Sequence, residues 1–64
     1  MKLTVNGEPR ELDETTTLAR LLEDQPPRGV AAAVDGEVVP RAEWAVFRLA
    51  DGQAVEILTA VQGG

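Results

Sequence analysis

The chain has 64 residues with no cysteine and no histidine, and its 11 acidic against 6 basic residues give a net charge of −5 at pH 7. This composition excludes disulfides and thiolate metal ligands, removes the usual acid–base side chain of neutral pH, and disfavours nucleic acid and anionic membranes, whose phosphates are repelled. One small domain is expected, and without an apolar h-region or a long apolar run we expect neither export nor a membrane span, which favours a cytoplasmic location.

The first predicted element is a β-hairpin. Polar and apolar residues alternate over residues 2–12 on either side of Asn6-Gly7, a pair typical of a two-residue type I′ turn. In that register Lys2 faces Glu11 across the two strands as an opposite-charge pair. Pro9 has no amide hydrogen to donate, so we expect the second strand to lie at an edge of the sheet.

A short helix is predicted next. Residues 13–17 are rich in N-cap residues, and Leu18, Leu21 and Leu22 follow at the spacing of one helical face. Pro26-Pro27 ends the helix, because the residue before a proline is pushed out of the α region. We therefore expect a helix of about two turns whose leucine face packs into the core.

The second half of the chain predicts three more strands. The first is built largely of alanine, which indicates that something bulky, such as the leucine helix, packs closely over it. Trp44 and Phe47 are the only aromatic residues, and each is expected to close one end of the core because aromatic rings bury much area. The predicted elements are a strand at 30–34, a turn at Asp35-Gly36, a strand at 37–39, a proline-led turn or single helical turn at 40–44, a turn at Asp51-Gly52 and a strand at 54–58.

The last strand is apolar enough to lie centrally in the sheet. Val55 and Ile57 share one face of it, and Leu58 points to the other. The order of hairpin, helix and then strands is typical of an α+β β-grasp (ubiquitin-like) fold, a mixed four- to five-stranded sheet with one main helix packed on one face. We accordingly divide the chain into a β-grasp domain, 1–59, and a flexible C-terminal tail, 60–64.

The sequence ends in a glycine pair that we interpret as the reactive group. Without Cβ atoms, Gly63 and Gly64 can enter a slot too narrow for other residues and present the terminal carboxylate. Beyond Glu56 no side chain is charged, so few groups would need desolvation when such an arm enters a partner. A frayed end or an expression remnant is the alternative interpretation of the pair taken alone.

Several short segments match one known family in order. They are Val5-Asn6-Gly7, Asp35-Gly36-Glu37-Val38-Val39-Pro40-Arg41 with Trp44, Asp51-Gly52, Val55-Glu56-Ile57 and Ala60-Val61-Gln62-Gly63-Gly64. On these segments the chain resembles, over essentially its whole length, the ThiS family of ubiquitin-like sulfur carriers of thiamine biosynthesis. The Val-Pro-Arg-x-x-Trp stretch and the terminal Val-Gln-Gly-Gly are more specific than Gly-Gly alone.

Two positions depart from the family pattern. Asp35 stands where the family often has Asn, which preserves the turn chemistry. Gln53 follows Asp51-Gly52 where an acidic residue is common, and this puts in doubt one charged contact of the usual partner surface.

The resemblance implies a carrier and not an enzyme. A terminal carboxylate is ionised at neutral pH and is a poor acyl electrophile, so it must be activated. In the family, a ubiquitin-activating-type (ThiF-like) adenylyltransferase joins the carboxylate of Gly64 to AMP, a donor such as a cysteine desulfurase or a rhodanese-type persulfide converts it to a thiocarboxylate, and a ThiG-like thiazole synthase receives the sulfur. Catalytic acids, bases and magnesium belong to these partners, so no catalytic residue, cofactor or metal is expected in this chain.

The tail and one strand face are the expected partner surface. Val61, Gln62, Gly63 and Gly64 would be recognised by the partner enzymes, and Leu58 lies on a sheet face that no second helix of this sequence can cover. An isolated exposed leucine is the alternative for Leu58. A molybdopterin-type sulfur carrier, a ubiquitin-like protein modifier and a non-covalent β-grasp interaction module are the alternative functions.

Overall fold

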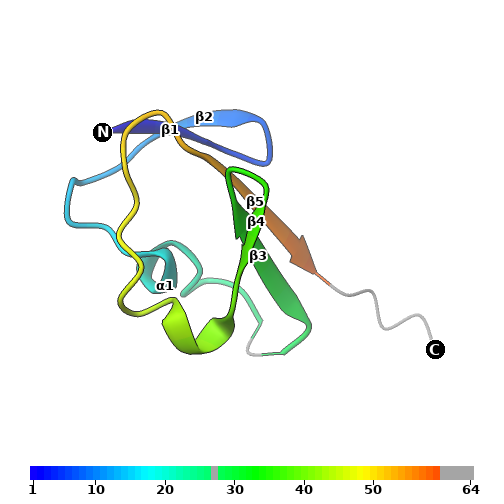
Figure 1. Cartoon of the computed structure of the whole chain (residues 1–64). Helices are drawn as coiled ribbons and strands as arrows, with labels where there is room; N and C mark the ends of the chain where they lie inside the picture. The colour runs from blue at the N-terminus through cyan, green and yellow to red at the C-terminus, as the bar shows by residue number, and fades with distance from the viewer. Residues whose placement is uncertain (27, 60–64) are drawn as a thin grey trace.

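The computed structural model describes residues 1–26 and 28–59. Five strands form one mixed sheet in the order β2-β1-β5-β3-β4, with a short helix beside it (Figure 1). This confirms the predicted α+β β-grasp architecture with the last strand at its centre, whereas the predicted tail, 60–64, lies outside the described residues. In chain order the elements are β1 (Lys2–Val5), β2 (Glu8–Glu11), α1 (Leu18–Leu21), β3 (Val30–Val34), β4 (Glu37–Val39), the 3₁₀-helix η1 (Arg41–Glu43) and β5 (Ala54–Thr59).

The N-terminal hairpin forms as its turn chemistry predicts. Asn6 and Gly7 both have positive φ angles, 52° and 83°, as a type I′ turn requires. The strands pair antiparallel with Lys2 opposite Glu11, which is the predicted register. β2, which contains Pro9, is an edge strand and is exposed at every residue.

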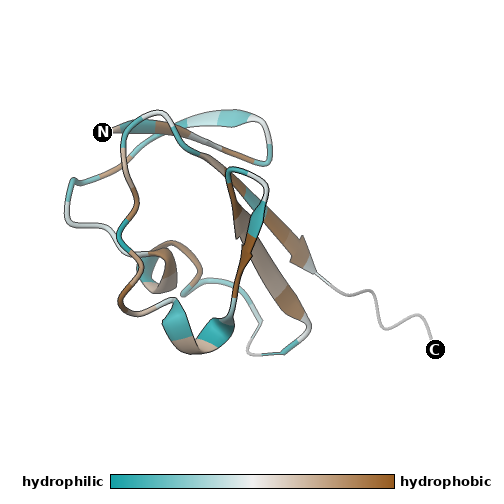
Figure 2. Cartoon of the chain, viewed as in Figure 1, coloured by the Kyte–Doolittle hydropathy of each residue, from teal (hydrophilic) through white to brown (hydrophobic). Residues whose placement is uncertain are grey.

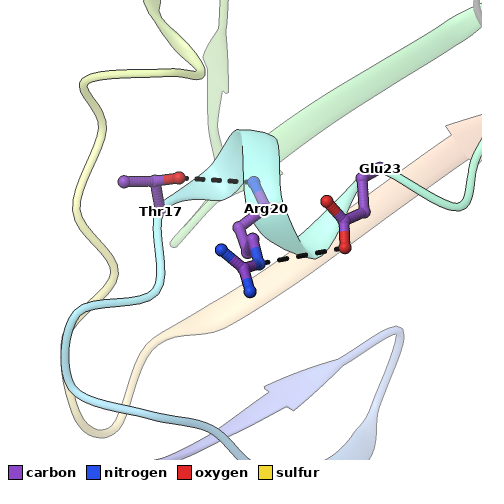
Figure 3. A network of polar contacts seen from close by, with 3 residues as sticks. All are labelled: Thr17, Arg20 and Glu23. Carbon is purple, nitrogen blue, oxygen red and sulfur yellow. Dashed lines mark hydrogen bonds and ion pairs between the residues drawn. The ribbon is translucent and has the colours of Figure 1, made fainter.

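Helix α1 is shorter than the two turns that the sequence predicts. Thr17 caps it, its hydroxyl oxygen accepting from the backbone N–H of Arg20 at 3.3 Å (Figure 3). At Leu22 the backbone leaves the helical region (φ −95°, ψ 5°), although its N–H still donates to the carbonyl of Leu18 at 3.0 Å. An exposed ion pair between Arg20 and Glu23, 3.8 Å apart, follows the turn and contributes little to stability because solvent screens it. One helical turn depends on packing rather than on its own hydrogen bonds.

The core lies between α1 and one face of the sheet. Ala32 is buried in the same cluster as the fully buried Leu18, as expected for an alanine-rich strand beneath a leucine helix. Trp44 is buried, and its indole Nε1–H donates to the carbonyl of Val39 at 2.8 Å. Phe47 is half-buried against the cluster. The buried residues are Leu3, Val5, Leu18, Leu22, Ala32, Val34, Val39, Trp44, Leu49 and Val55.

The central strand β5 has one buried and one open face, as predicted. Val55 is 1% exposed and Ile57 is half-buried on the helix side, whereas Glu56 and Leu58 are exposed on the other side. Figure 2 shows β3 and β5 as largely hydrophobic strands, in contrast to the hydrophilic edge strand β2. The outward face of the sheet therefore keeps apolar side chains in solvent.

Candidate functional site

Strand β5 leads the chain to its last described residue, Thr59. β1 pairs in parallel with only the first two residues of β5, whereas β3 pairs antiparallel with the last five. Beyond the reach of β1, the side-chain oxygen of Asn6 accepts from the backbone N–H of Ile57 at 2.8 Å. The start of β5 is thus held at both edges, and its end is held by a β-strand at one edge only.

Side-chain hydrogen bonds hold the segment that leads into β5. Asp35 accepts from the backbone N–H of Ala54, the first residue of the strand, at 2.9 Å. The backbone of Asp35 has a positive φ of 51°, which the turn requires and which Asp, like Asn, tolerates. Asp in place of the family's usual Asn therefore preserves the turn. Gln53 accepts from the backbone N–H of Ala50 at 2.7 Å. Gln53, the second position that differs from the family pattern, therefore stabilises its own turn.

An apolar patch lies on the outward face of the sheet. Leu58 is 65% exposed and pairs in register with Ala31 of β3. Val38 on β4 is 73% exposed and pairs with Ala33, the neighbour of Glu56 on β5. No element among residues 1–26 and 28–59 buries these two large side chains, which makes this face suitable for contact with another protein.

A groove of about 560 Å³ opens where β3 begins and β5 ends, and we call it the exit groove. Its apolar part includes Leu58 of the outward patch, and its polar part includes two arginines, Arg28 in the loop before β3 and Arg41 at the start of η1 after β4. The described residues that line it include Arg28, Val30, Ala31, Arg41, Leu58 and Thr59, and none of them is acidic. The groove thus joins an apolar surface to positive charge beside Thr59, the last described residue.

The arginine of η1 is positioned by stacking. The guanidinium carbon of Arg41 lies 4.7 Å from the centre of the Trp44 ring, a distance at which the cation is attracted to the face of the indole. Because Trp44 is itself buried and hydrogen-bonded to Val39, the stacking surface is fixed by the core. Arg41 therefore presents its guanidinium from a supported position.

The other polar sites have structural roles. Thr15 donates to Asp13 Oδ1 from its hydroxyl at 2.6 Å and from its backbone N–H at 2.8 Å, and these bonds, the hydroxyl one first, lower the pKa of Asp13. This carboxylate precedes α1 and orders the turn before the helix. In the part of the chain that the structure describes, no group of three acidic, histidine or cysteine side chains could hold a metal ion. Among the same residues, no helix is both long and apolar enough to cross a membrane.

The structure places one of the predicted site residues and adds two others. Leu58 lies on the outward face and lines the exit groove. The predicted Val61, Gln62, Gly63 and Gly64 lie outside the described residues. Sequence reasoning assigned no role to Arg28 or Arg41. The only sequence signal was the Val-Pro-Arg-x-x-Trp motif, which contains Arg41. The two arginines are 13 residues apart in the chain, and the fold brings both to one groove.

Comparison with known proteins gives the same family by sequence and by structure. The ThiS family matches residues 3–64. The sulfur carrier protein ThiS of Escherichia coli (strain K12) is 30% identical over 66 residues that cover all of both chains. A crystal structure of the thiamine biosynthesis protein ThiS from Geobacter metallireducens has a TM-score of 0.83 at 35% identity, again over all of both chains. A solution structure of a thiamine biosynthesis protein from the same organism has a TM-score of 0.78 at 35% identity over all of this chain and 88% of the other.

Proposed function

The chain belongs to the ThiS family, and we propose that Gly64 carries sulfur as a C-terminal thiocarboxylate. As a member of that family it is a sulfur carrier of thiamine biosynthesis and not an enzyme. The observation that carries the proposal is the family match itself, which covers residues 3–64 and therefore includes the glycine pair. The cytoplasm is the proposed location of the carrier.

The proposed chemistry begins with activation of the terminal carboxylate. A carboxylate oxygen of Gly64 attacks the α-phosphorus of ATP on a ThiF-like adenylyltransferase and releases pyrophosphate. A persulfide of a cysteine desulfurase or rhodanese-type donor attacks the acyl carbon and displaces AMP. A donor thiol then cleaves the acyl disulfide, which leaves the thiocarboxylate on Gly64 and a disulfide on the donor. A ThiG-like thiazole synthase would take the sulfur from this carrier.

The fold supports a division of labour between the domain, 1–59, and the proposed arm, 60–64. β5 runs antiparallel to β3 and ends at Thr59, opposite Val30, the first residue of β3 (Figure 1). Five residues then span at most about 17 Å when extended, so the acyl carbon reacts within that distance of Thr59. Gly63 and Gly64 at the tip of the proposed arm have no side chain and suit a narrow approach to a nucleotide pocket.

The outward patch around Leu58 is the proposed docking surface for the activating enzyme. It lies beside the last described residue, so a protein that binds the arm also meets this face. Removing Leu58 from water on docking would favour the complex, since about 25 cal/mol is gained per Å² of apolar surface buried.

Alkylation after the activating reaction tests the function. We expect that incubation with the cognate activating enzyme, ATP-Mg and a sulfur source creates one sulfur that reacts with iodoacetamide, and that fragmentation places the label on Gly64. The chain has no cysteine, so no other thiol competes. Alkylation is necessary because exchange of oxygen for sulfur adds nearly the same mass as oxidation of Met1.

Two controls accompany this measurement. Omission of ATP should abolish the label, and Gly64→Ala should fold normally yet be adenylated much more slowly, because the added Cβ narrows the approach and restricts the arm. An activated chain that resists alkylation, or a label elsewhere in the chain, contradicts the sulfur-carrier mechanism. Products joined through lysine side chains would instead indicate a protein modifier.

A further inference from the structure

We propose that the exit groove binds an acidic segment of the protein that activates Gly64, with Arg28 and Arg41 as the charges that recognise it. This inference rests on the proposed function, because it names the chemistry of the partner at the base of the same arm. The occupant is an extended stretch of partner chain with an aspartate or glutamate beside an apolar side chain.

The distribution of charge makes the groove an exception on this molecule. The net charge of the chain is −5, yet the described residues that line the exit groove include two of its six basic residues and no acidic one. Arg20 pairs with Glu23, whereas within the described residues neither Arg28 nor Arg41 has an acidic side chain in ion-pair range. An acidic partner segment is therefore repelled by most of the surface and attracted here, which sets the orientation of docking.

The guanidinium of Arg41 is well positioned to bind a carboxylate. Its guanidinium stacks on the ring of Trp44 at 4.7 Å, and Trp44 is only 7% exposed. Stacking uses the face of the guanidinium and leaves the N–H groups of its edge available for a bidentate bond with a carboxylate. A side chain that is already held loses less conformational freedom when it binds, so more of the interaction energy appears as affinity.

The apolar part of the groove favours a protein segment as the occupant. Leu58 and Ala31 stand side by side in the sheet and are both exposed beside the two arginines. A nucleotide phosphate would use the charges but not this apolar surface. The reach of about 17 Å from Thr59 to Gly64 also requires the activating enzyme to place its own surface next to the groove whenever Gly64 is in its nucleotide site.

Charge reversal with a matched control tests the proposal. We expect Arg41→Glu to weaken binding to the activating enzyme by about tenfold or more in calorimetry, and the loss to shrink as salt is raised. Arg48→Glu is the control, because Arg48 is also exposed, does not line the groove and undergoes the same change of charge. Its Kd should change by about twofold or less, as expected for a long-range charge effect alone. Equal losses in both variants overturn the proposal.

A second variant keeps the test independent of the core. Arg41→Glu removes the stacking on Trp44, so its fold is checked by the thermal midpoint and tryptophan fluorescence. Arg28→Glu leaves that stacking intact and should also weaken binding more than Arg48→Glu does. If Arg28→Glu and Arg41→Glu both bind like the wild type, the groove is not the recognition site. Alkylation of the wild-type chain at Gly64 reports on the proposed function separately.

Crosslinking identifies the chemistry of the occupant. Ala31→Cys supplies a single cysteine in the groove of a chain that has none, and a benzophenone maleimide attached there should capture an acidic peptide of the activating enzyme. The same label at Arg48→Cys is the control and should not capture that peptide. Capture of a basic peptide at Ala31→Cys overturns the proposal. Chemical-shift changes at Arg28 and Leu58 on titration of free ATP or AMP into the chain alone would assign the groove to the nucleotide instead.

Discussion

Both faces of the sheet carry apolar side chains, but the two faces differ in what covers them. On the inner face Val55 is 1% exposed beneath α1, whereas on the outer face Leu58, three residues later on the same strand, is 65% exposed. The chain has one four-residue helix and one 3₁₀ turn in its described part, enough to cover a single face. An apolar residue is therefore part of the core only if another element is available to pack on it.

The two faces of the sheet also differ in their polar side chains. Among the described residues the inner side buries no polar or charged side chain other than the indole of Trp44, whose N–H has its partner in Val39. On the outer side Glu56 is exposed on the same strand face as Leu58, and at the end of the sheet Arg28 and Arg41 line the exit groove together with Leu58. The inner face thus provides stability, and the outer face is free to provide recognition.

Truncation on the inner face should have the largest effect. Leu18 is fully buried, so Leu18→Ala should lower the free energy of unfolding by about 2 to 5 kcal/mol through lost burial and a residual cavity. That is a large part of the stability of a domain this small. Urea denaturation measures the change. Leu21→Ala is the control and should cost less, because Leu21 is only half-buried. Similar losses for both would show that the difference in burial between Leu18 and Leu21 does not set the cost of truncation.

A substitution on the outer face should leave the stability of the fold nearly unchanged. Leu58→Glu should change the free energy of unfolding by about 0.5 kcal/mol or less, since the side chain is already in solvent. Its binding to the activating enzyme should nevertheless weaken clearly in calorimetry. Val46→Glu is the matched control, because Val46 is 78% exposed but does not line the exit groove. Unchanged affinity for Leu58→Glu removes this face from the docking site.

The smallest effect concerns a site that belongs to neither face. The hydrogen bonds from Thr15 lower the pKa of Asp13 in the folded state, so they stabilise the fold above the unfolded-state pKa and this contribution is lost as the pH falls through the folded-state pKa. Asp13→Ala should lower the thermal midpoint slightly at neutral pH. Because Asp13 is exposed, the change should be small, and it should shrink in acid well below the ordinary aspartate pKa. An equal difference at both pH values would exclude the ionised carboxylate as its cause.

Local signals predicted the turns and strand faces well. Asn6-Gly7 and Asp35-Gly36 adopt the positive φ angles that those residue pairs favour. The alternation along 54–58 correctly separated Val55 from Leu58. The length of α1 was wrong, because the leucine spacing continues to Leu22 while the backbone leaves the helical region there. The candidate site was predicted only in part: Leu58 is where the alternation places it, but the groove beside it was not foreseen.

The sequence by itself determined where the chain turns and which strand residues share a face, because these properties depend on φ preferences and a two-residue period. Tertiary structure decided how long α1 is, which face of the sheet is covered and which charges meet. Arg28 and Arg41 share a groove because β3 pairs with both β4 and β5, which aligns the start of one strand with the ends of the other two. Such proximity arises from pairing between distant segments, and no local spacing in the chain encodes it.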